Sequence, residues 1–133
     1  MILPHSSTSN LVRFVLKRSD TGMGFTDLTN TSASLNIHTI TNNEASPTRY
    51  LSDDSNIETV ATIGTYAAPS ANKCRFRQVN ATYLPGLYEF QFADARFAVA
   101  SAKTLIVSVN NPNSNATLLD TDYEIQLVSW LAA

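Results

Sequence analysis

Hydrophobic and polar residues alternate along most of this chain with a period of two, the pattern of a β-strand that buries one face. In NLVRFVLKR, Val12, Phe14 and Leu16 share one face, whereas Arg13 and Lys17 share the other. Five further segments repeat the pattern. Their inward residues are Ala33, Leu35 and Ile37; Cys74 and Phe76; Tyr88, Phe90 and Phe92; Leu105, Val107 and Val109; and Tyr123, Ile125 and Leu127. Six strands are therefore predicted.

The segments between these strands are rich in Gly, Pro, Asn, Asp and Ser, which favour turns. They cover residues 19–24, 42–47, 84–86 and 110–116. Since no long helical pattern separates the strands, the chain is predicted to be all-β, a single antiparallel β-sandwich with at most one or two short helical turns. Residues 55–70 fit either a short helix or a seventh strand, and a strand or a single helical turn is favoured.

Two local features refine this prediction. Pro85 presets φ and Gly86 permits a positive φ, so the LPG segment is expected to reverse the chain just before an aromatic strand. Tyr88 would then enter the core and return its hydroxyl to the turn backbone, as in a tyrosine corner. Beyond that strand, Asp94 is expected to cap a helical turn and Phe97 to fill the end of the sandwich.

The order of these segments resembles a known family. VRFVLKRSDTGMGFTDLT, CRFRQVN, LPGLYEFQFADARFAVASAKTLIVSVN and a final YEIQLV are similar to the Ig-like β-sandwich domains of structural proteins of tailed bacteriophages. The resemblance extends over residues 11–128 and is carried mainly by residues 84–109 and 123–128. It implies an assembly role and supplies no catalytic residues, although neither the attached repeats nor the second domain of that pattern is expected here. Residues 1–10 are expected to be a flexible arm, and 129–133 a C-terminal tail.

Composition limits the functions to consider. The 133 residues suit one domain, only 15% of them are charged, and the net charge of −2 lacks the basic excess of nucleic-acid-binding domains. Neither a signal peptide nor an 18-residue apolar run is visible, so a soluble protein with no membrane partner is expected. The single cysteine, Cys74, cannot form an internal disulfide and is interpreted as a small buried apolar residue.

No residue pattern points to an enzyme. The carboxylate pairs Asp53–Asp54 and Asp120–Asp122 lie in polar loops, where turn formation explains them better than acid–base catalysis. Calcium binding by the second pair lacks an EF-hand spacing. The two histidines, His5 and His38, cannot complete a three-ligand zinc site and are not near a nucleophile motif. No cofactor or metal is expected.

Two surface features are candidates for binding a partner. Lys73, Arg75 and Arg77 alternate along one strand face; they are either a solvated basic stripe or a contact for acidic side chains of a neighbouring protein. Trp130 and Leu131 lie beyond the last strand and would bury against a neighbouring subunit, or else extend the domain's own core.

We therefore expect a non-enzymatic structural protein of a virus particle, made in the host cytoplasm and located in the virion. Capsid decoration and a tail, neck or baseplate role are the options, with other virion proteins or copies of itself as partners. The alternative is a carbohydrate-binding or host-recognition module. Its candidate surface aromatics, Tyr50, Tyr66, Tyr83 and Trp130, are scattered through different loops, which favours assembly.

Overall fold

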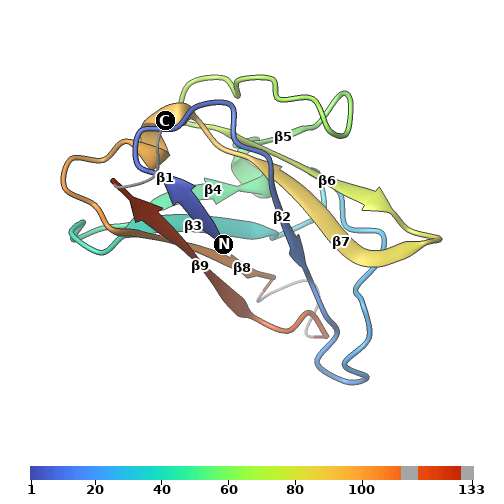
Figure 1. Ribbon diagram of the computed structural model, residues 1–133. Coiled ribbons are helices and arrows are strands. Elements are labelled where there is room, and N and C mark those ends of the chain that lie inside the picture. Colours follow the sequence, from blue (N-terminus) through green and yellow to red (C-terminus); the bar gives the residue numbers. More distant parts are fainter. Residues whose placement is uncertain (112–116, 130–133) are drawn as a thin grey trace.

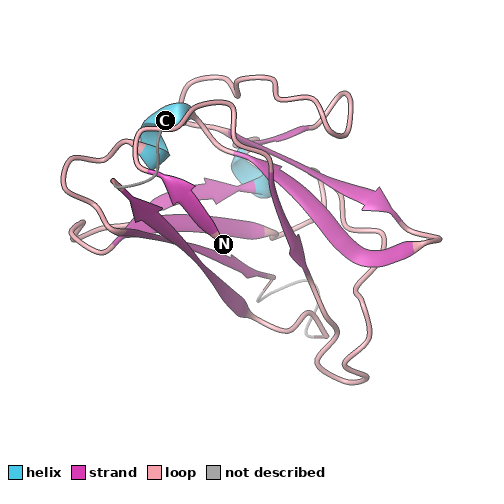
Figure 2. Cartoon of the chain, viewed as in Figure 1, coloured by secondary structure: helices cyan, strands magenta, loops and turns pink. Residues whose placement is uncertain are grey.

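The computed structural model describes residues 1–111 and 117–129 and shows two β-sheets packed face to face (Figure 1). The strands are β1 (Ile2–Pro4), β2 (Val12–Val15), β3 (Asn36–Thr41), β4 (Thr48–Leu51), β5 (Ile57–Thr59), β6 (Cys74–Asn80), β7 (Leu84–Gln91), β8 (Thr104–Asn110) and β9 (Thr121–Val128). Within the described residues, helix is confined to two short 3-10 turns, η1 (Ser52–Asp54) and η2 (Asp94–Phe97), as Figure 2 shows. The predicted all-β sandwich is confirmed.

The five-stranded sheet has the order β1-β9-β8-β3-β4, and the four-stranded sheet has the order β2-β7-β6-β5. Neighbouring strands are antiparallel except at two sheet edges, where β1 pairs with β9 and β5 pairs with β6 in parallel. The placement of β9, β8 and β3 opposite β2, β7 and β6 reproduces the strand order of Ig-like sandwiches. Sequence periodicity therefore led to the correct architecture.

The strands that periodicity missed are the short β1 and β4, whereas β5 is the seventh strand that was one of the favoured options for residues 55–70. Three or four residues are too few to show an alternation, so only their pairing partners define them. Residues 1–10 were expected to be a flexible arm, but Ile2 and Leu3 pair with Gln126 and Leu127 of β9. Ala33, predicted to point inward, is exposed because β3 begins only at Asn36.

The inner faces of both sheets form one hydrophobic core. The predicted inward residues of β2, β6, β7, β8 and β9 belong to it or pack against it, and Cys74 is fully buried as predicted. Aromatic rings dominate the four-stranded side. The Phe76 and Tyr88 rings stack with centroids 4.8 Å apart, and Phe90 meets Phe76 edge-on at 5.1 Å. Such contacts add to the stabilisation that comes from burying area alone.

Pro85 and Gly86 do not form the chain reversal. The turn lies at residues 81–83, where the Asn80 Oδ1 accepts hydrogen bonds from the N–H groups of Thr82 and Tyr83. Gly86 lies inside β7 with φ +88°, and a Cβ there would be 2.6 Å from the Gly24 Cα. The positive φ of Gly86 was predicted correctly. Its role is different, because it lets the backbone of β7 pass close to the segment that follows β2.

Tyr88 also has a different partner from the one expected. Its hydroxyl donates to the Phe25 carbonyl at 2.7 Å and accepts from the Leu28 N–H at 3.1 Å, so it secures the β2–β3 connection. Burial raises the pKa of Tyr88 to about 12. Asp94 does not cap η2; its carboxylate accepts the N–H of Ser9 at 2.8 Å. Phe97 is fully buried, as predicted.

Candidate interaction surfaces

The two outer faces of the sandwich differ, and the cause is the segment of residues 60–73, here called the strap. It connects β5 to β6, which are parallel neighbours, and parallel neighbours require a crossover instead of a tight hairpin. The strap takes this path over the outer face of the four-stranded sheet, and in Figure 1 it arches across the top of the molecule. This face is therefore covered by the chain itself.

Glu89 and Gln91 of β7 are fully buried beneath the strap, although their positions alternate with the core residues. The Glu89 carboxylate accepts hydrogen bonds from Arg13 at 2.9 Å, the Gly64 N–H at 3.1 Å and the Gln91 amide at 3.0 Å. Gln91 in turn accepts the Ala67 N–H at 2.9 Å. A buried carboxylate is tolerated because each of its oxygens has donors.

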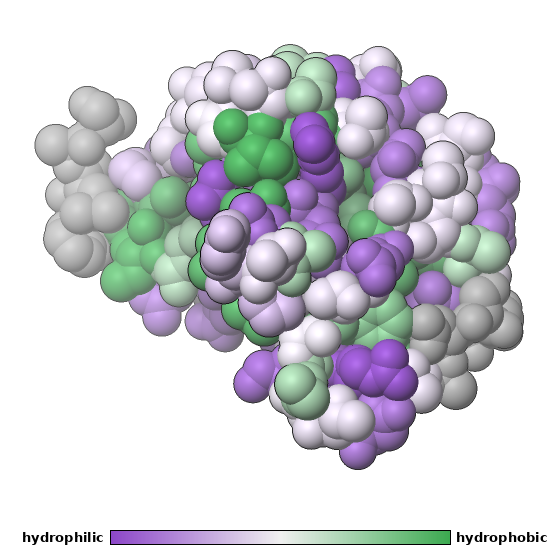
Figure 3. Space-filling view, turned by 90° about the vertical axis from the view of Figure 1, so that its right-hand side faces the viewer, coloured by the Kyte–Doolittle hydropathy of each residue, from purple (hydrophilic) through white to green (hydrophobic). Residues whose placement is uncertain are grey.

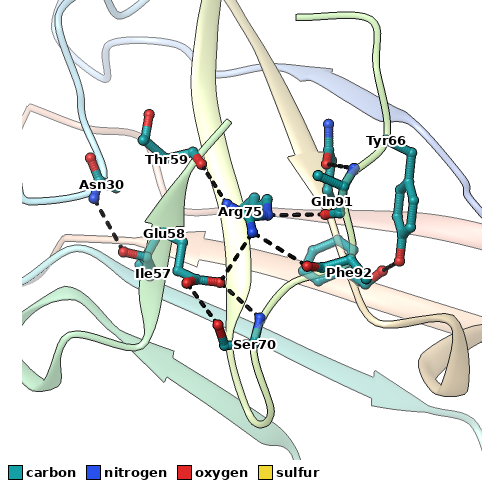
Figure 4. Close-up of polar contacts among 11 residues, drawn as sticks. Asn30, Ile57, Glu58, Thr59, Tyr66, Ser70, Arg75, Gln91 and Phe92 are labelled. Carbon is teal, nitrogen blue, oxygen red and sulfur yellow. Dashed lines mark hydrogen bonds and ion pairs between the residues drawn. The ribbon is translucent and has the colours of Figure 1, made fainter. Parts of the chain in front are cut away.

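Arg75 lies at the centre of a second group of polar contacts that hold the strap (Figure 4). Its guanidinium donates to the carbonyl groups of Thr59, Ala67 and Ala68. Glu58 accepts both the N–H and the hydroxyl of Ser70 at 2.9 Å. The Ser70 N–H, aided by the Ser70 hydroxyl and Arg75, lowers the pKa of the Glu58 carboxyl below its usual value.

The predicted basic stripe has an intramolecular role in this arrangement. Arg77 donates to the carbonyls of Val60 and Ala61, both at 3.1 Å, next to the Arg75 contacts. Lys73 is half-buried at the end of the strap. Binding of a partner by this stripe stays a prediction, but two of its guanidinium groups already donate to the protein's own backbone. Trp130 and Leu131, the other predicted contact residues, lie outside the described residues.

The outer face of the five-stranded sheet is here called the open face. One row across it consists of Arg49 on β4, His38 on β3, Ser108 on β8 and Asp122 on β9, which are consecutive pairing partners. Arg49 and Asp122 are exposed, in contrast to the buried Glu89 of the other sheet. On this face, side chains from the central strands β3 and β8, as well as from β4 and β9, point away from the core.

A second row lies beside the first and consists of Ile40 on β3, Ile106 on β8 and Glu124 on β9. The two isoleucines are half-buried at the centre of the open face. Among residues 1–111 and 117–129, the side chains of Arg49, Asp122 and Glu124 have no hydrogen-bond or ion-pair partner. The open face therefore combines an aliphatic centre with one basic and one acidic edge.

His38 lies next to Arg49 on this face. Its Nε2 atom is buried without a hydrogen-bond partner in the described part of the chain. Burial, together with the positive charge of Arg49, lowers the pKa of His38 and so favours the neutral ring.

A pocket of about 410 Å³ lies between residues 27–30 and β6. The side chains of Asp27, Asn30, Arg77 and Gln78 line it, together with Leu28 and Phe76. Asp27 has φ +70°, an uncommon value for a non-glycine residue, and its N–H donates to the Gln78 side chain. Carboxylate, amide and guanidinium groups can donate to and accept from a polar ligand here.

Exposed large apolar side chains of the described residues are spread over several parts of the chain: Met1, Ile2, Val15, Met23, Tyr83, Leu84 and Leu119. Tyr83 at the tip of the β6–β7 hairpin is 82% exposed, and Met23 is 69% exposed. Figure 3, which views the right-hand side of Figure 1, shows separate hydrophobic areas within hydrophilic and neutral surface. Tyr50, expected at the surface, is buried, and the half-buried Tyr66 donates its hydroxyl to the Phe92 carbonyl at 2.9 Å. Tyr83 is thus the exposed aromatic within the described chain.

The residues considered for catalysis have structural contacts or stand apart. Asp53 accepts the N–H and the hydroxyl of Ser34, the turn-forming role that was expected. The His5 ring forms a hydrogen bond with the Val99 carbonyl at 2.8 Å, which is a structural contact. No group of three or more His, Cys, Asp or Glu residues that could hold a metal ion occurs in the described segments.

Comparison with protein-family models, curated proteins and solved structures finds no match to this chain. Within the described residues, no helix is long and apolar enough to cross a membrane.

Proposed function

We propose that this protein is a non-enzymatic structural module of a virus particle, either a capsid decoration protein or a tail, neck or baseplate component. The observation that carries the assembly role is the contrast between the two outer faces. The strap covers one of them, while the other presents Ile40 and Ile106 between exposed charges. An apolar centre inside a polar rim is the usual anatomy of a protein interface. The virion setting is supported by the sequence resemblance to phage Ig-like domains.

Detection in purified particles tests this proposal. Particles from cells that express the gene are separated on a density gradient, and the protein is quantified by mass spectrometry across the fractions. We expect a fixed ratio of this chain to the major capsid or tail protein in the particle peak, and none for an abundant host protein used as a control. Absence from the particle peak would contradict the virion role.

The pocket beside β6 favours a second candidate function, binding of a carbohydrate. Asp27, Asn30 and Gln78 offer planar polar groups that can form hydrogen bonds to sugar hydroxyls, and the volume of about 410 Å³ is within the range of ligand sites. The stacking surface expected of such modules is limited to Tyr83 in the described chain. A glycan array probed with the wild type and with Asn30→Ala distinguishes this candidate, since only pocket binding is lost in the variant.

A further inference from the structure

We propose that the open face binds the open face of a second copy of this chain, which gives a dimer with two-fold symmetry. This inference rests on the proposed assembly function and names its partner.

The first step is the separation of opposite charges on the open face. Arg49 lies on β4, whereas Asp122 and Glu124 lie on β9, and β3 and β8 run between them. Three strand spacings of about 4.8 Å place these edges roughly 14 Å apart, too far for an ion pair within one chain. Each charge can therefore be neutralised only by a group that approaches the face from outside.

The second step is the symmetry that brings opposite charges together. Two copies of one face can meet through a two-fold axis that lies in the interface plane. An axis perpendicular to the strands would place β4 over β4 and β9 over β9, so like charges would meet. An axis parallel to the strands and between β3 and β8 places β4 of one copy over β9 of the other. The charge pattern selects this second axis.

The third step is the match along each row. Under this axis Arg49 lies over Asp122 of the second copy, and His38 lies over Ser108 of the second copy. In the next row Ile40 lies over Ile106 of the second copy, so an aliphatic contact forms beside the row that holds the two ion pairs. Facing sheets pack about 10 Å apart, which allows these side chains to meet. The two-fold axis repeats each of these contacts in the other half of the interface.

A partner of a single charge sign would fit less well. A basic surface would suit β9 and oppose Arg49, and an acidic surface would do the reverse. Juxtaposed like charges suppress association with such partners. A second copy carries both signs at the required spacing.

Paired charge reversals test the proposal by analytical ultracentrifugation of the full chain. Arg49→Glu makes both edges of the face acidic, and the double variant Asp122→Lys, Glu124→Lys makes both edges basic. Each variant alone is expected to dimerise at least about tenfold more weakly than the wild type. An equimolar mixture of the two is expected to restore a dimer containing one chain of each kind. Lys17→Glu, a reversal outside the open face, is the control and should leave dimerisation unchanged.

Circular dichroism melts show that each variant is folded before it is scored. A wild type that stays monomeric at its highest soluble concentration would overturn the proposal. So would a dimer that neither single reversal weakens, or a mixture of variants that fails to associate. A monomeric protein found at a fixed ratio in virus particles would refute the dimer and leave the proposed function standing.

Discussion

Replacement of Glu89 by Gln should release the strap from the four-stranded sheet. The amide keeps the shape of the side chain but replaces one acceptor oxygen with a donor, which then faces the donors of Arg13, Gly64 or Gln91. An unsatisfied buried donor costs about 1–3 kcal/mol. The partly exposed ion pair with Arg13 adds about 0.2–1 kcal/mol. The expected loss is therefore about 1–4 kcal/mol.

For a chain of 133 residues this loss corresponds to a decrease in Tm of roughly 4–14 °C. Hydrogen exchange locates the effect. The amides of Gly64 and Ala67 should exchange much faster, whereas the exchange rates of the core-strand amides should change only as far as the global stability changes. Asp54→Asn, in the exposed η1 turn, is the matched control and should change Tm by less than about 2 °C. If Glu89→Gln melts like the control and the Gly64 amide stays protected, Glu89 does not hold the strap.

Four further outcomes are expected. Gly86→Val should cost at least about 1–3 kcal/mol in a thermal melt, because the positive φ and the approach to another backbone exclude a side chain; an unchanged melt would contradict this. Phe90→Ala should cost about 3–5 kcal/mol by leaving a cavity, and a melt like the parent's would show that the ring is not in the core. The Arg96 hydrogen bond lowers the pKa of Glu44 from 4.5 to about 2, so its stabilisation is present above pH 4.5 and is lost as the pH falls toward 2; Arg96→Gln should flatten that part of a stability–pH curve, and identical curves would argue against the pair. Burial raises the pKa of Cys74, so a thiol reagent should modify it only in denaturant, and rapid labelling of the native protein would refute its burial.

The long strands could be read from the sequence because their alternation records which face is buried. The same alternation failed at Glu89 and Gln91, which it places on a polar and therefore exposed face. Their burial comes from the strap, and the path of the strap depends on the parallel pairing of β5 with β6, which no local pattern encodes. A Glu and a Gln two residues apart in an aromatic strand are the visible signal, but alternation alone assigns them to a polar face.

The turn residues show a similar division. Gly86 could be identified as a position that needs a positive φ, because glycine tolerates it without a steric cost. Gly24, which the Gly86 backbone approaches closely, lies more than sixty residues upstream. This contact depends on the tertiary structure and cannot be predicted from the local sequence. The open face was not identified from the sequence. Its separation of charge depends on the order of strands β4, β3, β8 and β9 in the sheet.

Most of the hydrogen bonds between side chains of the four-stranded sheet and the strap are made to main-chain atoms of the strap. These atoms are the N–H groups of Gly64 and Ala67 and the carbonyls of residues 60, 61, 65, 67 and 68. Every amino acid has the backbone carbonyl, and every amino acid except proline has the backbone N–H. Thr62, Thr65 and Ala68 are exposed, so their side chains are free to change without loosening the attachment. Variation among relatives should accordingly concentrate in the strap and spare Glu89, Gln91 and Arg75. The same property makes the strap a place where foreign peptide sequences can be displayed on an unchanged scaffold.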